Sequence, residues 1–300
     1  MSCRRESPHV RRREQRGAVL VEFALIAFVL ALLLVAIMDL GRAIWTTQAL
    51  QDVARVAARE LSLAPLPATM DFDTALAATS DTIFDPHLLV VDLDVHPEGP
   101  DLDAYFASMP IVNRMLRPLM IPDDVSTDAG PQHLLRYPGA LLADSDPGSP
   151  TGLTVAIPRV LSRDAQGIET IDWVPVLEEI RSSPGDPASG PFSVASTGVD
   201  HGLVALRVNY PWQAAAMSAY LPSVNGPGTP NLDGVITADD AQVSAPPPPG
   251  AGVSLLSDST AVGAYAGPYG LGRQFAYGKT VRPFRRLIST QAIYRREVLQ

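Results

Sequence analysis

The chain has 300 residues, of which 46% are hydrophobic and 18% are charged, a composition typical of a folded protein rather than a disordered one. Its net charge of -9 is unevenly distributed: residues 1–17 carry six Arg against two Glu, and residues 273–300 carry six Arg and one Lys against one Glu. The middle of the chain is therefore strongly acidic and repels phosphate backbones, which excludes a nucleic-acid-binding protein. The single cysteine, Cys3, excludes an intrachain disulfide framework and a cysteine-ligated zinc cluster.

An apolar segment of 21 residues, 18–38, follows the basic leader. Fourteen of its residues are Leu, Ile, Val or Phe, and Glu22 is its one charged residue. A helix of this length, rising ~1.5 Å per residue, can cross a hydrocarbon layer of ~30 Å. Because arginines cluster before the segment, the positive-inside rule predicts a cytoplasmic N-terminus and export of everything after Asp39.

Two other interpretations of this segment are a cleaved secretory signal and an uncleaved membrane anchor. A secretory signal has a hydrophobic stretch of roughly 7 to 15 residues and a small-x-small cleavage site. Residues 18–38 are longer than this, and residues 38–42 (Met-Asp-Leu-Gly-Arg) offer no such site, so the signal is disfavoured. The other interpretation, an uncleaved single-pass membrane anchor, is not excluded by these features.

A glycine, Gly17, lies at the boundary between leader and apolar segment, and Glu22 is the fifth residue after it. This pattern resembles the processing site of type IV prepilins and pseudopilins, which a prepilin peptidase cuts after the glycine. Glycine has few backbone restrictions, so it lets the chain lie extended in a protease cleft. The resemblance implies that Glu22 pairs with the new N-terminal amine, that of Ala18, on this or a neighbouring subunit. Alternatively, Glu22 extends to the lipid headgroups.

Three stretches narrow the resemblance to one family. Residues 22–25 (Glu-Phe-Ala-Leu), 39–43 (Asp-Leu-Gly-Arg-Ala) and 48–59, rich in Ala and Arg, together resemble the N-terminal segment of TadE-like proteins, minor pseudopilins of tight-adherence (Tad or Flp) pili. Residues 208–212 (Val-Asn-Tyr-Pro-Trp) and 287–297 are similar to later strands of that family. The resemblance implies an assembly role with other Tad pilins and pseudopilins and the pilus assembly platform.

The helix is expected to continue beyond the membrane, because no proline occurs between residue 40 and Pro65. Small or apolar residues in this part recur at alternating steps of four and three, which is the a/d spacing of a packing seam. Such a seam predicts a close contact with another helix or a sheet, supplied either by a partner subunit or by the chain's own exported domain. The seam consists of Ala43, Thr47, Leu50, Ala54, Ala57 and Leu61.

Beyond Pro67, alternation with period two predicts strands, including 89–95, 204–210 and 288–294, and a hairpin of 151–157 with 168–176. Seven prolines predict that residues 221–250 are loop or extended linker, and residues 97–200 and 221–280 look like insertions into a smaller core.

The predicted fold class is α+β: a long N-terminal transmembrane helix continuing into an exported β-rich domain with long Pro/Gly-rich loops, a pilin-like architecture. The predicted division is a leader (1–17), transmembrane helix (18–38), exported helix (39–64), β-rich domain (65–220), Pro/Gly-rich insertion or linker (221–280), and terminal strand with basic tail (281–300).

Candidate metal ligands lie in the acidic middle. Residues 229–240 follow the spacing of an EF-hand-type calcium loop, with Asn231, Asp233 and Asp240 at positions 3, 5 and 12. Thr229 replaces the first Asp of such a loop, and the alternative is an Asp-Gly turn in a linker. Four Asp-x-Asp pairs, which begin at residues 71, 92, 101 and 144, are weaker calcium candidates. No cofactor other than Ca²⁺ is suggested.

The sequence lacks the motifs of common catalytic sites. No His-Glu-x-x-His, Gly-x-Ser-x-Gly, phosphate-binding loop or dinucleotide fingerprint occurs. We therefore expect a structural protein and not an enzyme. Its expected location is the bacterial cytoplasmic (inner) membrane, with a single span, a cytoplasmic N-terminus and an exported C-terminal domain, and association with the pilus after processing.

Overall fold

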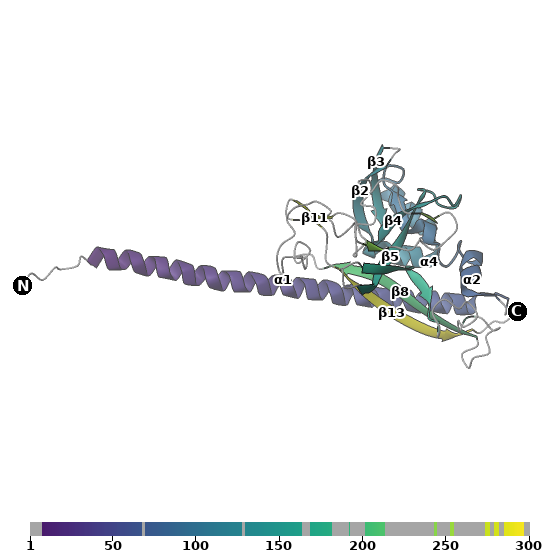
Figure 1. The fold of residues 1–300 in the computed structure, drawn as a ribbon, viewed down its shortest axis with the longest axis horizontal. Coiled ribbons are helices and arrows are strands. Elements are labelled where there is room, and N and C mark those ends of the chain that lie inside the picture. Colours follow the sequence, from purple (N-terminus) through teal and green to yellow (C-terminus); the bar gives the residue numbers. More distant parts are fainter. Residues whose placement is uncertain are drawn as a thin grey trace, which may run out of the picture. The chain divides into compact units, whose positions relative to one another are not determined.

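In the computed structural model the chain forms two compact units, residues 1–45 and 46–300. Figure 1 shows the helices as coiled ribbons and the strands as arrows. The structure describes residues 8–67, 70–127, 130–163, 169–181, 192, 202–213, 243–244, 253–254, 274–276, 279–281 and 285–296. The fold class is α+β, as predicted: a long apolar N-terminal helix is followed by a region built of small β-sheets.

The first helix, α1 (Pro8–Leu63), begins earlier than predicted, inside the basic leader. It ends at Leu63, as predicted, because Pro65 and Pro67 follow and cannot continue a helix. Its part from Leu20 onward is the one described helix long and apolar enough to cross a membrane. The predicted change from membrane helix to exported helix, after residue 38, lies within the first unit.

The last turns of α1, from Thr46, belong to the second unit and bury one face in its core. Three of the buried residues are alanines, whose short side chains let the helix backbone approach a sheet closely. They share one hydrophobic core with Val204, Leu206 and Ala292, which come from strands near the other end of the chain. The buried helix residues are Leu50, Val53, Ala54, Ala57, Ala58 and Leu61.

The sheet that shares this core has the strand order β13-β8-β7. Strand β8 (Leu203–Gln213) pairs antiparallel with β13 (Arg285–Arg295) over the whole length of both, from Leu203 opposite Arg295 to Gln213 opposite Arg285. Strand β7 (Leu177–Glu179) is a short edge on the other side of β8. The predicted strands 204–210 and 288–294 are confirmed, and each is longer than predicted.

A second sheet, of order β1-β3-β2, corrects one prediction. The predicted strand 89–95 is only β1 (Val90–Asp92), preceded by a 3-10 helix, η1 (Pro86–Leu89). Asp85 accepts a hydrogen bond from the backbone N–H of His87 and so caps η1, and Asp92 accepts one from the N–H of Asp94 and ends the strand. The strand predicted from the alternation was too long, because local aspartate turns replace both of its ends. Accordingly, Leu89, Val90 and Val91 are all buried, whereas Val95 is 65% exposed.

The remaining elements of this region are helices and the partners of β1. Strands β2 and β3 pair antiparallel, as do β3 and β1. The elements are α2 (Phe72–Ala78), α3 (Pro100–Ser108), α4 (Ile111–Leu116), η2 (Arg117–Leu119), β2 (Ile121–Thr127) and β3 (Gly130–Arg136).

A five-stranded sheet of order β10-β4-β5-β6-β9 contains the predicted hairpin, which is confirmed by the antiparallel pairing of β5 and β6. Within the predicted linker 221–280, the described residues form short strands, of which β9 and β10 extend this sheet and β11 and β12 pair with each other. The strands are β4 (Ala140–Asp144), β5 (Leu153–Arg163), β6 (Glu169–Val174), β9 (Val243–Ser244), β10 (Val253–Ser254), β11 (Gln274–Ala276) and β12 (Lys279–Val281).

Residues 97–200, which look like an insertion in sequence, contribute to the same core as α1. Val112, Leu134 and Leu141 are buried in one cluster with Leu50 and Leu206. The described residues of this region therefore pack as part of one domain and not as an attachment to a smaller one.

The alanine face of α1, which carries the buried residues Ala54, Ala57 and Ala58, allows a prediction about the stability of the second unit. Replacing Ala57, which is fully buried, by Leu should destabilise the second unit by roughly 1–3 kcal/mol, because a packed core does not accommodate three extra carbon atoms without strain. Gln51→Leu, at an exposed position of the same helix, should change stability little. Urea unfolding of the full chain in detergent, followed by tryptophan fluorescence, measures both; equal effects of the two substitutions would contradict the packing.

Candidate functional site

The first unit presents an apolar helix surface with one carboxylate. Most large hydrophobic side chains from Leu20 to Trp45 are 51–70% exposed, whereas Val35, Asp39 and Ala43, which follow one another at steps of four, are half-buried. A continuous apolar surface of this extent is the surface of a segment that contacts lipid or other helices rather than water. Glu22 is exposed on this surface and forms no hydrogen bond or ion pair with any other described residue.

The predicted cleavage residues, Gly17 and Ala18, lie within α1 and have helical backbone. Glycine in a helix interior lowers local stability by roughly 0.5–1 kcal/mol relative to alanine, so the helix is weak at this point. Pro8 is the first residue of the helix, a position at which proline is tolerated. Gly17, Ala18 and Glu22 therefore lie on two successive turns of one helix, and no described part of the chain folds back onto Glu22.

Past the apolar segment, α1 carries residues suited to a membrane boundary. Trp45 is half-exposed, and Arg42 is exposed one turn before it. Tryptophan is enriched where lipid headgroups meet water, and long basic side chains near helix ends extend to the same layer. Nothing lies within 4 Å of the place where a side chain at Gly41 would begin, so nothing in this structure requires a glycine there.

The predicted packing seam changes its surroundings along its length. Leu50, Ala54, Ala57 and Leu61 are buried in the core of the second unit. Ala43 and Thr47 are half-buried. For the four buried positions, the structure shows the chain's own domain as the packing partner, which is one of the two contacts that the sequence left open.

The strand residues 208–212 are held by a buried polar network that sequence reasoning missed. The Tyr137 hydroxyl donates to the Asn209 carbonyl oxygen at 2.9 Å, and its ring meets the Tyr210 ring edge to face. The Asn209 side-chain amide donates to Glu178, and Ser289 on β13 donates to Asn209. Burial raises the pKa of Tyr137 well above its usual value, so the hydroxyl keeps its proton and donates at all physiological pH values.

The end of β13 is tied to the segment that follows α1. Arg296 is almost fully buried; its Nη2 donates to the Leu66 carbonyl oxygen at 2.8 Å, and its guanidinium lies over the Phe192 ring. The Phe192 N–H donates to Glu179, which also accepts from Arg181. Burial raises the pKa of Glu179. These contacts give Arg296, which lies in the family-like stretch 287–297, a structural role.

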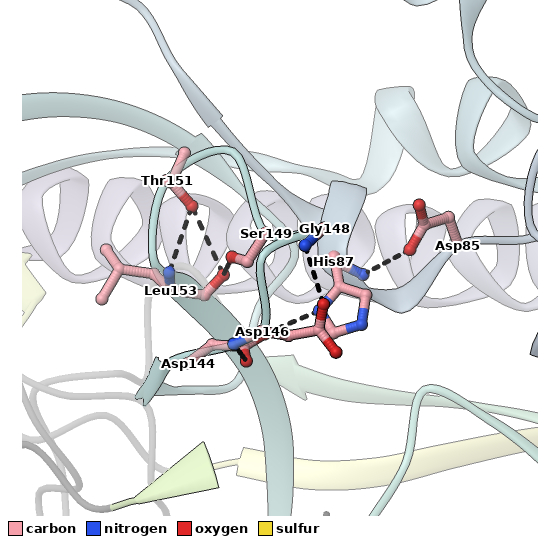
Figure 2. A network of polar contacts seen from close by, with 8 residues as sticks. All are labelled: Asp85, His87, Asp144, Asp146, Gly148, Ser149, Thr151 and Leu153. Carbon is pink, nitrogen blue, oxygen red and sulfur yellow. Dashed lines mark hydrogen bonds and ion pairs between the residues drawn. The ribbon is translucent and has the colours of Figure 1, made fainter. Parts of the chain in front are cut away.

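A polar network joins η1 to the turn between β4 and β5, and Figure 2 shows its side chains converging there. The His87 ring Nδ1 and an Asp144 carboxylate oxygen are 2.6 Å apart, and the Asp144 side chain is fully buried. The other Asp144 oxygen accepts from the Asp146 N–H, and Asp146 accepts from the Gly148 N–H.

This histidine-aspartate pair resembles part of a catalytic triad but lacks the nucleophile. Among the described residues, no hydroxyl or thiol is bonded to His87. The nearby Ser149 and Thr151 hydroxyls donate to the Leu153 carbonyl oxygen instead, as Figure 2 shows. The network therefore closes a turn rather than positioning a nucleophile.

In three of the four Asp-x-Asp pairs, which are candidates for weak calcium binding, the first carboxylate caps a helix or closes a turn. Asp71 caps α2 by accepting from the Thr74 N–H, and hydrogen bonding with the side chain and the N–H of Thr74 lowers the pKa of Asp71. Asp92 and Asp144 each accept from the N–H two residues on, and Asp103 pairs with Arg117 at 2.6 Å. Within the described residues there is no group of three His, Cys, Asp or Glu that could hold a metal ion.

The predicted calcium loop lies outside the described residues. Asn231, Asp233 and Asp240 all fall in the part of the chain that the structure leaves undescribed. The calcium prediction therefore stays a prediction.

Part of α1 matches a known protein family. Residues 17–59 match the family described as TadE-like protein, the family that the sequence suggested. The matched segment begins at Gly17 and includes Glu22, the apolar surface and most of the buried helix face. No curated protein and no solved structure matches the chain.

Asp85, at the edge of the His87 network, makes a pH prediction. Burial raises the pKa of Asp85, because it disfavours the ionised carboxylate in the folded state. As the pH falls through this raised pKa, the carboxylate is protonated and the folded wild type should gain stability relative to a neutral variant. Asp85→Asn keeps an acceptor for the His87 N–H and should be at least as stable as wild type at pH 7. That advantage should shrink as the pH is lowered toward 4. Urea unfolding across this range is the measurement, and a pH-independent difference would contradict the assignment.

Proposed function

We propose that this chain, whose residues 17–59 match the TadE-like family, is a minor pseudopilin of a Tad pilus system. In this proposal it is inserted once in the bacterial inner membrane with its N-terminus in the cytoplasm. A prepilin peptidase cuts it after Gly17, and the new chain joins or primes the pilus through its long helix. The second unit is then the exported domain.

The observation that carries the proposal is the position of Glu22. A carboxylate in an apolar, lipid-length helix is costly unless it has a partner, and among the described residues Glu22 has none. A partner supplied from outside the helix removes this cost. The Ala18 amine that cleavage would create on a neighbouring subunit is such a partner, because it carries a positive charge at the same depth of the membrane.

Two further features support assembly over a solitary anchor. The apolar surface of the first unit extends around the helix, so neighbouring helices can contact it from several directions. In the second unit, by contrast, one face of α1 is occupied by the chain's own core. Contacts between subunits are therefore expected through the part of α1 before Thr46.

Processing is tested by substituting the cleavage glycine. Gly17→Leu should block trimming, because a branched side chain restricts the backbone and fills the space next to the scissile bond. Mass spectrometry of the membrane fraction from a host with an active prepilin peptidase should find a wild-type chain that starts at Ala18 and a variant that keeps its leader. Gly41→Leu is the control, since that glycine has open space around it and lies away from the cleavage point.

Retention of the leader by the wild-type chain would contradict processing. It would favour the alternative, an uncleaved single-pass membrane protein whose exported β-rich domain is an interaction module.

The role of Glu22 is tested separately from cleavage. Glu22→Ala should be trimmed as wild type but should enter pili poorly, with at least a several-fold loss of the chain from sheared pilus preparations, because the N-terminal amine of a neighbour loses its counter-charge. Asp52→Ala is a matched control: Asp52 is an exposed acid on the same helix, and its surface ion pair with Arg55 contributes little to stability. Normal incorporation of the Glu22 variant would refute amine pairing.

A further inference from the structure

Strand β13 (Arg285–Arg295) is the edge strand of its sheet. All eleven of its residues pair with β8, and among the described residues no strand pairs with its other side. In an antiparallel pair every second residue directs its N–H and C=O toward the neighbour, and the residues between direct theirs outward. One side of β13 therefore carries a row of backbone donors and acceptors available to an incoming strand.

The second half of this edge is open to solvent in the folded chain. Gln291, Ile293 and Arg295, which share one face of the strand, are exposed, and so is Tyr294 on the opposite face, where Ala292 is buried. Only the last residues of the strand are therefore exposed on both of its faces. Ile293 is 58% exposed, so an incoming strand could cover its apolar side chain.

Apart from its three arginines, β13 lacks the usual protections of an edge strand. Proteins blunt such edges with charged side chains, prolines, bulges or very short strands. The register with β8 runs without interruption, and β13 contains neither proline nor glycine. The other edge strand of the same sheet, β7, is only three residues long, and edge strand β2 of the neighbouring sheet carries Pro122.

The charges of β13 indicate which segment would fit. The strand contains Arg285, Arg286 and Arg295 and no acidic residue. A second copy of β13 pairing antiparallel in full register would place Arg285 opposite Arg295 at both ends, and like charges directly opposite each other are destabilising. Carboxylates at the same places would instead be stabilised.

We propose that the open edge of β13 accepts an extended acidic segment of a different polypeptide, which adds to the sheet as a fourth strand beside β13. Main-chain hydrogen bonds would supply affinity, and carboxylates opposite the three arginines would supply selectivity. This surface lies in the second unit and does not depend on processing at Gly17.

Amide hydrogen exchange of the full chain in detergent tests whether the edge is open. Residues of β13 should alternate between slow exchange, where the N–H bonds to β8, and fast exchange, where it points outward. Slow exchange along the whole strand would overturn the proposal, because the edge would then be covered already.

Binding is tested with a synthetic peptide of alternating Thr and Val that ends in two Asp on each side, against the same peptide with Lys in place of Asp. The Asp peptide should bind at least about tenfold more tightly and should slow the fast-exchanging amides of β13. Ile293→Lys should abolish this protection, and Arg295→Glu should weaken binding about two- to fivefold. Val95→Lys, which alters an equally exposed apolar residue outside β13, should leave binding unchanged.

Three outcomes would overturn the proposal. They are no binding of the Asp peptide, equal binding of the two peptides, and self-association of the free chain that Ile293→Lys abolishes. The last would identify a second copy of this chain as the occupant.

Discussion

The contact between the alanine face of α1 and the strands β8 and β13 is the constraint on which the second unit depends. Ala54, Ala57 and Ala58 leave no side chain beyond the first carbon, so the helix backbone can approach the sheet closely. The two strands come from the last third of the chain, and their pairing in a register of eleven residues brings its end back to the helix. Arg296 then fixes that end through the Leu66 carbonyl.

One continuous helix therefore has two kinds of surface. Before Thr46 most of its large hydrophobic side chains are exposed and need lipid or other helices, and from Leu50 onward one face is buried in the core of the second unit. The only carboxylate in the apolar part, Glu22, belongs to the unsatisfied region. The TadE-like match covers both regions, which is consistent with a module that joins a membrane helix to a folded domain.

Several elements could be read from sequence because their signals are local. The end of α1 follows from Pro65 and Pro67, and the strands β8 and β13 follow from alternation over long stretches. The strand 89–95 could not be read in this way, because Asp85 and Asp92 bond to neighbouring backbone N–H groups and replace strand by turns. The same chemistry engages the first carboxylate of three Asp-x-Asp pairs, those of Asp71, Asp92 and Asp144.

By itself, the sequence determined the membrane-length helix, its isolated glutamate and the class of the fold, since hydrophobicity, proline and alternation act within a few residues of one another. Only the tertiary structure decided what the packing seam contacts, which strands are neighbours and which edge stays open. These depend on the pairing of segments such as β8 and β13, which are separated by more than seventy residues. No local pattern specifies such a pairing, because it is set by which surfaces bury one another when the whole chain folds.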